Sequence, residues 1–592
     1  MNKLLRLFLL SGMVAILAQL TTACHNQPSA QLEDSSSLPV AKDVERDQRQ
    51  RQSELMESAQ VGRSADSVNQ NFRNRGLTPR ASMPLSGSPN AASKPVPRRS
   101  VTAAKRMPLL TAEHAIPEAS NRENYSPIDE NAFQRVKHNP LSTFAIDVDT
   151  ASYSNLRRFL NNGQLPPTDA IRIEELINYF NYDYPEPESD RPFSITTEIS
   201  QAPWNPTHKL VHIGIQGEKM AIEDLPPSNL VFLLDVSGSM NSPNKLPLLK
   251  DAFRMLVNEL REEDQVSIVV YAGAAGVVLP PTPGNEKDKI LTAIENLNAG
   301  GSTAGGAGIK LAYKLAQDNF IKSGNNRVIL ATDGDFNVGV SSDTELVTLI
   351  EQKRKKGVFL TVLGFGTGNL QDSKMEKIAN KGNGNYAYID NELEAKKVLV
   401  NEIGATLLTI AKDVKIQVEF NPAKVQAYRL IGYENRRLKD EDFNDDTKDA
   451  GELGAGHTVT ALYEIIPVGA KTNVKLPDID PLKYQSNAAS TTNSKELMQV
   501  KLRYKEPDGN TSQLLTYPLV DKAVKLEDAS DNFKFSAAVA SFGMVLRDSP
   551  YKGKASFDQA LQLAKESEGV DLEGYRAEFI DLVESAEEIG DR

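Results

Sequence analysis

The sequence predicts an α/β protein built around a doubly wound, mostly parallel sheet. Between residues 228 and 405, short apolar runs alternate with helical stretches, which is the pattern of a parallel sheet covered by helices on both faces. The regions on either side contain strand-like runs separated by polar turns. We therefore expect a doubly wound domain inserted in a β-sandwich-like flanking domain, with helices at the C-terminal end.

Each strand of the central domain is predicted from a short apolar run. In open α/β sheets, ligands gather at the carboxyl ends of the strands, so functional residues should directly follow these runs. The runs cover residues 230–234, 266–271, 328–331, 359–363 and 386–389.

Strand-like runs also flank the central region. The runs at 193–199 and 209–215 end just before it, and the run at 414–420 begins just after it. We expect these three to share one β-sandwich into which the central domain is inserted, because each set alone would leave unpaired edges. The other flanking elements expected are helices at 153–160 and 171–180 and strands at 144–148, 425–433, 458–465 and 498–504.

Helical spacing returns at the C-terminal end of the chain. From residue 532 onward, Phe535, Val539, Phe542 and Leu546 recur at intervals that place them on one face of a helix. Core packing accounts for this stripe. Two further helices are expected at 557–563 and 575–583.

Oxygen-bearing residues follow two of the predicted central strands. Asp235, Ser237 and Ser239 come directly after the first run, and Asp333 follows the run at 328–331. A glycine-rich segment between them carries Thr303. Hydroxyl and carboxylate oxygens suit a hard cation such as Mg²⁺, which takes about six oxygen ligands and keeps several waters.

These five positions resemble the metal-ion-dependent adhesion site of the von Willebrand factor type A family. That family's pattern is Asp-x-Ser-x-Ser, then a distant Thr, then a distant Asp, and Asp235, Ser237, Ser239, Thr303 and Asp333 match it in order. The resemblance implies a site for Mg²⁺, or for Mn²⁺ or Ca²⁺, with the hydroxyls as direct ligands and the aspartates acting mostly through water. It also implies that a partner carboxylate completes the metal's coordination. Asp264 and Asp335 lie near the motif and are expected to be exposed loop carboxylates rather than ligands.

Composition and motifs argue against several other classes of function. The net charge of -12 disfavours a nucleic-acid-binding protein, which would normally show a basic face. The glycine-rich segment lacks the Gly-Lys-Ser/Thr end of a phosphate-binding loop. A serine hydrolase using Ser302 would need a nearby histidine, and only His457 follows it. Asp147 and Asp149 resemble a phosphoryl-transfer motif incompletely, and a strand end with acidic residues explains them better.

The N-terminal segment has the layout of a secretory signal. Lys3 and Arg6 precede an apolar run at 7–20, and Cys24, the only cysteine in the chain, follows it. This arrangement resembles the lipid-attachment site of bacterial lipoproteins, and His25 in place of Asp favours the outer membrane if the host has one. Residues 25–124 are polar and predict a disordered linker with a reach of roughly 55 Å.

The predicted organisation has five parts and one leading function. We expect a non-enzymatic envelope protein, attached to the membrane only by its lipid, that binds an acidic group of a partner protein through its metal. A metal-dependent hydrolase, or a subunit of a larger envelope machine with the central domain as docking module, is the alternative. The metal site should face away from the sandwich and the linker. The parts are a signal at 1–24, the linker at 25–124, flanking regions at 125–227 and 406–592, and the central domain at 228–405.

Lipid attachment at Cys24 can be tested directly in cells. A fatty-acid analogue should label the parent protein and leave Cys24→Ser unlabelled, because the thiol is the attachment point. Gel fluorescence of the immunoprecipitated proteins measures the difference. Equal labelling of both proteins contradicts lipidation at this cysteine, and labelling of neither favours a plain cleaved signal.

Overall fold

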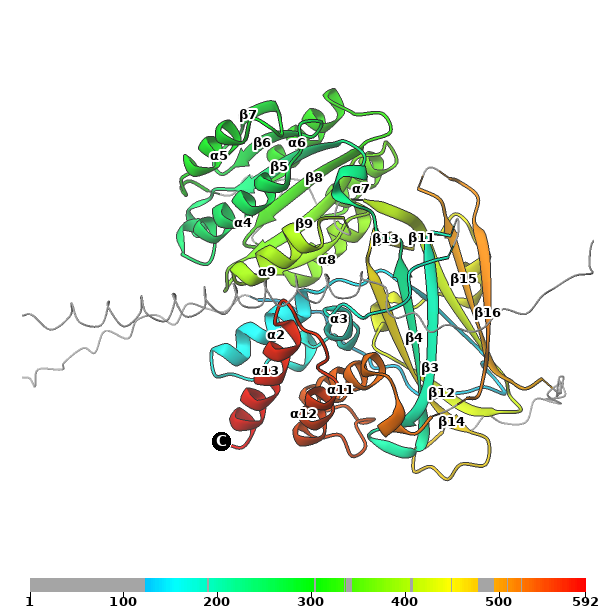
Figure 1. Ribbon diagram of the computed structural model, residues 1–592. Helices are drawn as coiled ribbons and strands as arrows, with labels where there is room; N and C mark the ends of the chain where they lie inside the picture. Colours follow the sequence, from blue (N-terminus) through cyan, green and yellow to red (C-terminus); the bar gives the residue numbers. More distant parts are fainter. Residues whose placement is uncertain are drawn as a thin grey trace, which may run out of the picture. The chain divides into compact units, whose positions relative to one another are not determined.

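The computed structural model describes residues 123–592 apart from short gaps (Figure 1). All of the described residues belong to one compact unit. Cys24 and the rest of residues 1–122 lie outside the described part, so the signal and the linker stay predictions, as do the domain boundaries. The gaps are residues 189–190, 303–304, 335, 337–342, 405–407, 449, 477–493, 508 and 523.

The central domain contains a six-stranded sheet in the order β10-β9-β8-β5-β6-β7. All neighbouring strands pair in parallel except β7, which is antiparallel to β6. The five predicted runs are all strands, which confirms the doubly wound fold. The strands are β5 (Ser228–Asp235), β6 (Gln265–Tyr271), β7 (Ala275–Pro283), β8 (Asn325–Thr332), β9 (Phe359–Phe365) and β10 (Tyr386–Ile389).

Helices cover both faces of this sheet, and alternate residues of β5 reach each face. Leu230, Phe232 and Leu234 pack in one apolar cluster, whereas Val231 and Leu233 pack in another. This alternation follows from the two-residue period of a strand. The first cluster includes residues of α4 (Leu246–Glu259), α5 (Lys287–Glu295), α9 (Glu392–Lys396) and the π-helical turn η5 (Lys397–Asn401). The second includes residues of α6 (Gly305–Asp318), α7 (Asp343–Arg354) and α8 (Asp372–Lys381).

The flanking strands form a sandwich of two mostly antiparallel sheets. One sheet has the order β1-β12-β14-β4-β3, and the other has the order β13-β11-β15-β16 with β2 also paired to β11. The strands are β1 (Gln134–Arg135), β2 (Leu141–Ala145), β3 (Phe193–Ala202), β4 (Asn205–Gly217), β11 (Thr409–Phe420), β12 (Val425–Ile431), β13 (Gly451–Gly454), β14 (Thr458–Pro467), β15 (Glu496–Lys505) and β16 (Gln513–Val520).

This sandwich confirms that the central domain is inserted in a β-sandwich. The strands that precede the insertion, β3 and β4, lie in one sheet, and β11, which follows it, lies in the other. Val211 from β4 and Ile416 from β11 are buried in the same apolar cluster between the sheets. Neither sheet is complete without strands from both sides of the insertion, since β4 pairs with β14 and β11 pairs with β2.

A layer of helices covers the other face of the β4 sheet. Leu210 and Leu462 point into this layer, whereas their neighbours Val211 and Tyr463 point into the sandwich core. α11 is buried nearly all round, so the prediction of a single apolar face was incomplete; the helix packs against α3 and α12 as well as facing the sheet. The helices are α2 (Ala151–Asn161), α3 (Ile173–Asn178), α11 (Asp531–Leu546), α12 (Phe557–Glu566) and α13 (Tyr575–Gly590). Short 3-10 turns lie at Thr168–Ala170, Ile222–Asp224, Gly238–Asn241, Glu434–Arg436, Asp440–Asn444 and Leu526–Asp528.

A buried arginine connects the helical layer to the central domain. Arg157, on α2, has a fully buried side chain that pairs with Asp390, after β10, and with Glu394 on α9 at 2.8 Å. It also pairs with Glu578 on α13 at 3.0 Å and donates to the Tyr179 hydroxyl. One guanidinium therefore joins three parts of the chain that are far apart in sequence.

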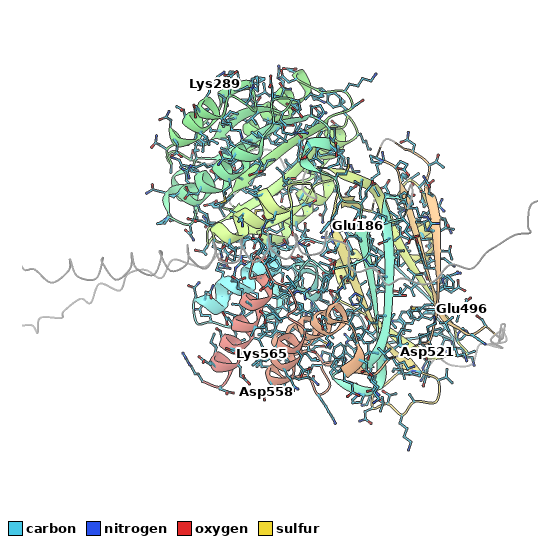
Figure 2. All side chains as sticks on the ribbon, viewed as in Figure 1. Glu186, Lys289, Glu496, Asp521, Asp558 and Lys565 are labelled. Atoms are coloured by element: carbon cyan, nitrogen blue, oxygen red, sulfur yellow. The ribbon has the colours of Figure 1, made fainter. Side chains whose placement is uncertain are left out.

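Other charged residues lie at the surface of the described structure. Lys289 on α5 and Asp521 after β16 are both exposed (Figure 2). No helix in the described part of the chain combines the length and the apolar character that a membrane crossing requires.

Removing the buried arginine should destabilise the protein far more than removing an exposed one. Arg157→Ala leaves buried carboxylates unpaired, so we expect a loss of about 3–5 kcal/mol of unfolding free energy. Arg254→Ala is the matched control, because Arg254 also pairs with two carboxylates but is 42% exposed, and it should cost less than about 1 kcal/mol. Urea denaturation followed by the fluorescence of Trp204, the single tryptophan, measures both. Equal costs for the two variants would contradict the structural role given to Arg157.

Candidate metal centre

The first loop of the centre follows β5 and presents two hydroxyls side by side. The hydroxyl oxygens of Ser237 and Ser239 lie 3.0 Å apart. The Ser237 amide donates to Asp235 Oδ1 at 2.9 Å, which curls the loop around the carboxylate. Asp235 and Ser237 are buried, whereas Ser239 is exposed. The loop thus offers oxygens to a cation on a side that solvent can reach.

Parallel pairing of β5 with β8 brings the second carboxylate to the same place. The register pairs Leu234 with Ala331, so Asp235 and the segment Thr332-Asp333 emerge together at the edge of the sheet. Asp235 Oδ2 accepts hydrogen bonds from the hydroxyls of Tyr271 at 3.0 Å and Thr332 at 3.3 Å. Asp333 is fully buried and pairs with Lys245, whose Nζ lies 2.8 Å from Oδ2.

The glycine-rich loop is attached to the β5 loop by backbone hydrogen bonds. The Gly300 amide donates to the Val236 carbonyl at 2.8 Å, and the Gly238 amide donates to the Gly301 carbonyl at 3.1 Å. Thr303, the fifth predicted ligand, lies outside the described residues, as does Asp335. The described part of the centre therefore consists of Asp235, Ser237, Ser239 and Asp333, which the structure brings together.

Gly334 is required by the shape of the β8 loop. Its φ of +97° lies in a region that favours glycine. A Cβ added there would lie 2.6 Å from the Asn369 carbonyl oxygen and 2.8 Å from the Gln371 amide nitrogen. The loop after β9 therefore packs directly against the loop that carries Asp333.

Burial raises the pKa of the Asp235 carboxyl, and the nearby negative charge of Asp333 adds to this effect. Hydrogen bonds from Ser237 act in the opposite direction. The two carboxylates therefore repel each other in a poorly solvated place, which is an arrangement that a divalent cation would relieve.

Three residues around the centre were not identified from the sequence: Lys245, Tyr271 and Asn369. Tyr271 ends strand β6, so its position at the carboxyl end of a strand could have revealed it. The amide nitrogen of Asn369 lies 3.5 Å from Asp333 Oδ2. Asn369 follows β9 only after several residues, so its place in the sequence indicates a role at the strand ends less clearly. Lys245 precedes a helix by one residue, where a charged residue normally indicates a solvated surface.

The prediction that Asp264 is an exposed loop carboxylate was wrong. Asp264 is buried, accepts a hydrogen bond from the Ser228 amide at 2.8 Å and pairs with Arg261 at 2.9 Å. Since Ser228 begins β5 and Asp264 precedes β6, this carboxylate lies at the edge of the sheet opposite Asp235. Its burial arises from tertiary contacts that sequence spacing does not reveal.

The predicted orientation of the centre was also wrong in one respect. Ser239 is exposed, as expected for a presented site, but the first described residues of the chain lie close to the centre. Glu123 accepts a hydrogen bond from the Gly368 amide at 3.0 Å, and the Asn124 amide donates to the Leu370 carbonyl at 3.1 Å. Asn369, between them, contacts Asp333. The C-terminal end of the predicted linker therefore lies beside the centre, not on the opposite side.

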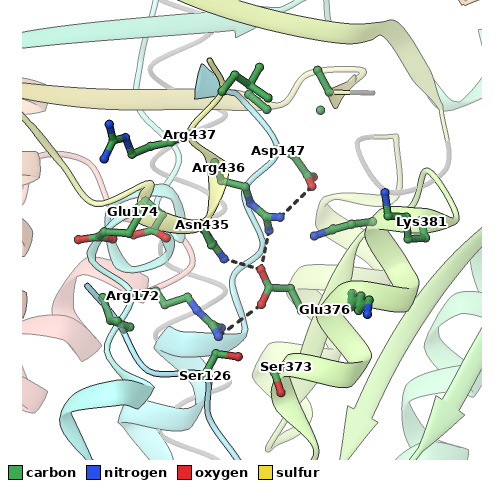
Figure 3. A pocket seen from close by; sticks show the side chains of 18 of the residues that line it. Ser126, Asp147, Arg172, Glu174, Ser373, Glu376, Lys381, Asn435, Arg436 and Arg437 are labelled. Atoms are coloured by element: carbon green, nitrogen blue, oxygen red, sulfur yellow. Dashed lines mark hydrogen bonds and ion pairs between the residues drawn. The ribbon is translucent and has the colours of Figure 1, made fainter. Parts of the chain in front are cut away.

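Asp147 and Asp149 have a structural role where the central domain meets the flanking domain. Asp149 is buried, accepts a hydrogen bond from the Tyr386 amide at 2.8 Å and pairs with Arg436 at 3.0 Å. Arg436 also pairs with Asp147 and with Glu376, and these residues line a pocket of about 560 Å³ (Figure 3). The ion pairs occupy both aspartates, which supports the interpretation of this segment as a strand end rather than a phosphoryl-transfer site.

The donor set of the centre fits a hard cation. Within the described ranges, no group of three His, Cys, Asp or Glu side chains is placed to hold a metal. A metal held here would therefore depend on the serine hydroxyls together with two carboxylates. Such an oxygen-only set suits Mg²⁺, Mn²⁺ or Ca²⁺ and does not suit Zn²⁺, which prefers Cys and His.

Three protein families match successive parts of the chain. Residues 119–212 match the family described as von Willebrand factor, residues 229–402 match the von Willebrand factor type A domain, and residues 405–589 match the C-terminal region of the uncharacterized protein YfbK. The middle match contains all five predicted ligands.

Individual proteins are also similar to this chain, to different extents. The uncharacterized protein YfbK of Escherichia coli is 45% identical over 476 residues, covering 79% of this chain and 81% of the relative. Human inter-alpha-trypsin inhibitor heavy chain H3 is 25% identical over 46% of this chain and 32% of its own length. Among solved structures, a von Willebrand factor type A protein from Catenulispora acidiphila matches 64% of this chain and 88% of its own, at 17% identity and a TM-score of 0.36. This chain belongs to the bacterial YfbK family, whose central part is a von Willebrand factor type A domain.

Proposed function

We propose that this protein is a non-enzymatic adhesion or scaffold protein of the cell envelope that grips a partner protein through a bound divalent cation. Von Willebrand factor type A domains commonly mediate protein–protein interaction. In this proposal Asp235, Ser237, Ser239, Thr303 and Asp333 hold Mg²⁺, and a carboxylate of the partner completes its coordination. The single observation that carries the proposal is the pair of hydroxyls of the buried Ser237 and the exposed Ser239, 3.0 Å apart, beside two buried carboxylates.

The chemistry of these groups favours holding a ligand over transforming one. Serine hydroxyls are neutral ligands, so they neutralise none of the cation's charge and leave it attractive to an anion. Asp235 is held in place by its hydrogen bonds to Ser237, Tyr271 and Thr332. The sequence between residues 228 and 405 contains neither histidine nor cysteine, the usual general base and thiol nucleophile of hydrolytic enzymes.

The proposed location is the membrane surface of the envelope, in the outer membrane of a host that has one. Its basis is the N-terminal signal layout and the position of Cys24 directly behind it. A lipid on Cys24 would be the only membrane attachment in this proposal. The centre would then be presented to a protein partner near the membrane surface.

Metal binding should depend on the residues of the centre and not on carboxylates elsewhere in the domain. Mg²⁺ should bind the parent weakly to moderately and raise its unfolding temperature, because binding to the native state alone stabilises it. Asp235→Ala and Asp333→Ala should abolish both effects. Ser239→Ala should weaken Mg²⁺ binding roughly tenfold, about 1.4 kcal/mol, with no change of stability in chelator, because this side chain is exposed.

Calorimetric titration with MgCl₂ measures the affinities, and Asp251→Ala is the control. Asp251 lies on α4, is 39% exposed and pairs with the exposed Arg254, so its removal should leave Mg²⁺ binding unchanged. Mg²⁺ binding of parental strength in Asp235→Ala or Ser239→Ala would rule out the proposed site.

A further inference from the structure

A lysine is built into the proposed metal centre. Lys245 is the residue that precedes α4, and its side chain is only 7% exposed. Its Nζ lies 2.8 Å from Oδ2 of the fully buried Asp333. The Lys245 amide also donates to the Ser242 carbonyl at 3.0 Å, which fixes the start of the side chain. This lysine is therefore part of the interior of the domain rather than a mobile surface group.

The backbone at Gly366 leaves a narrow slot for the stem of Lys245, which is the aliphatic part of its side chain. Gly366 follows β9 with a φ of +74°, and a Cβ at this position would lie 2.3 Å from Cγ and 2.4 Å from Cε of Lys245. The Gly366 carbonyl accepts a hydrogen bond from the Tyr388 hydroxyl at 2.7 Å, which holds the slot in place. A side chain other than glycine at 366 would displace the stem. The contact between Lys245 and Asp333 thus depends on several separate features of the fold.

The charges around the centre are asymmetric. The hydrogen-bond donors that the structure shows at Asp235 are neutral: the Ser237 amide and the hydroxyls of Tyr271 and Thr332. Asp333 instead faces the Lys245 ammonium group. Among the described residues of the centre, two carboxylates and one ammonium carry one net negative charge, so a bound divalent cation would leave this group with one net positive charge. Without the lysine, the loaded centre would be neutral.

We propose that Lys245 determines the ligand specificity of the centre. Its charge lowers the affinity of the centre for the metal and strengthens the preference of the metal-loaded centre for an anionic ligand. The ammonium group repels the divalent cation, and in a poorly solvated site this repulsion is only partly screened. The same positive charge attracts a carboxylate that approaches the loaded centre, whereas a neutral amide gains little from it. This proposal rests on the proposed function and adds to it the reason why the centre selects an acidic group.

Lys245→Met tests the proposal, because it removes the charge and keeps an unbranched side chain in the slot. The full-length protein is titrated with MgCl₂ in a calorimeter, alone and with a fixed excess of either acetate or its neutral analogue acetamide. A ligand that binds the loaded centre must raise the apparent Mg²⁺ affinity by the same factor by which Mg²⁺ raises its own affinity. Acetate should strengthen Mg²⁺ binding to the parent severalfold, and acetamide should not.

The variant is expected to change two quantities in opposite directions. Lys245→Met should bind Mg²⁺ about tenfold more tightly than the parent, and the effect of acetate on that affinity should become severalfold smaller. Lys250→Met, on the same helix, is the control, because its exposed ammonium group donates only to the Glu295 carbonyl in the structure, and it should behave as the parent. Lys245→Gln provides a second uncharged variant if the methionine variant unfolds in chelator.

Other outcomes separate the two proposals. Weaker Mg²⁺ binding in both Lys245 variants, together with a lower unfolding temperature, would show that Lys245 only supports the fold and would overturn its role in specificity. Unchanged Mg²⁺ affinity and unchanged coupling to acetate would overturn it as well. A parent that binds no Mg²⁺, Mn²⁺ or Ca²⁺ would overturn the proposed function itself, and the specificity role with it.

Discussion

The parallel pairing of β5 with β8 is the constraint on which the centre depends. Every residue of both strands is buried, and both lie in the middle of the sheet between β6 and β9. Their register fixes Asp235 beside Thr332, which places two acidic loops at one edge. A slip of one residue would turn the Asp235 side chain to the opposite face and would also reverse every apolar contact of the strand. The geometry of the centre is thus specified by the same contacts that hold the domain together.

The insertion of the central domain is secured by charged groups rather than by apolar packing alone. Arg157 joins α2 to the end of β10, and Arg172 pairs with Asp372 at 2.8 Å and with Glu376 at 3.3 Å, both on α8. Buried ion pairs gain little net stability because desolvation is costly, yet the loss of one partner is strongly destabilising. Any other placement of the inserted domain would separate these ion pairs and leave buried charges without partners, so it is disfavoured.

Much of the fold could be predicted from sequence because its strands are strongly apolar. The run at 386–389 coincides with β10, whereas β7 (Ala275–Pro283) was missed. β7 is an edge strand that contains Gly276 and several prolines, and such residues weaken a strand signal although they are tolerated at an edge. The ligand positions in the described residues were found because they follow strands in a recognisable pattern. Asp264 was misjudged and Lys245 was missed because burial of a charge depends on partners distant in sequence. The distant partner is the Ser228 amide for Asp264 and the Asp333 carboxylate for Lys245.

The loop after β9 gives the centre a connection that sequence patterns could not show. Gly366 packs against the Lys245 stem, Asn369 contacts Asp333, and the neighbouring backbone at Gly368 and Leu370 bonds to Glu123 and Asn124. Within five residues, from Gly366 to Leu370, this loop therefore contacts both the charged groups of the centre and the first described residues of the chain. Because closely packed groups cannot shift independently, the position of the Lys245 ammonium group is coupled to that of Glu123 and Asn124. A partner that reaches the exposed hydroxyl of Ser239 would meet a centre whose electrostatics are set jointly by the sheet and by this loop.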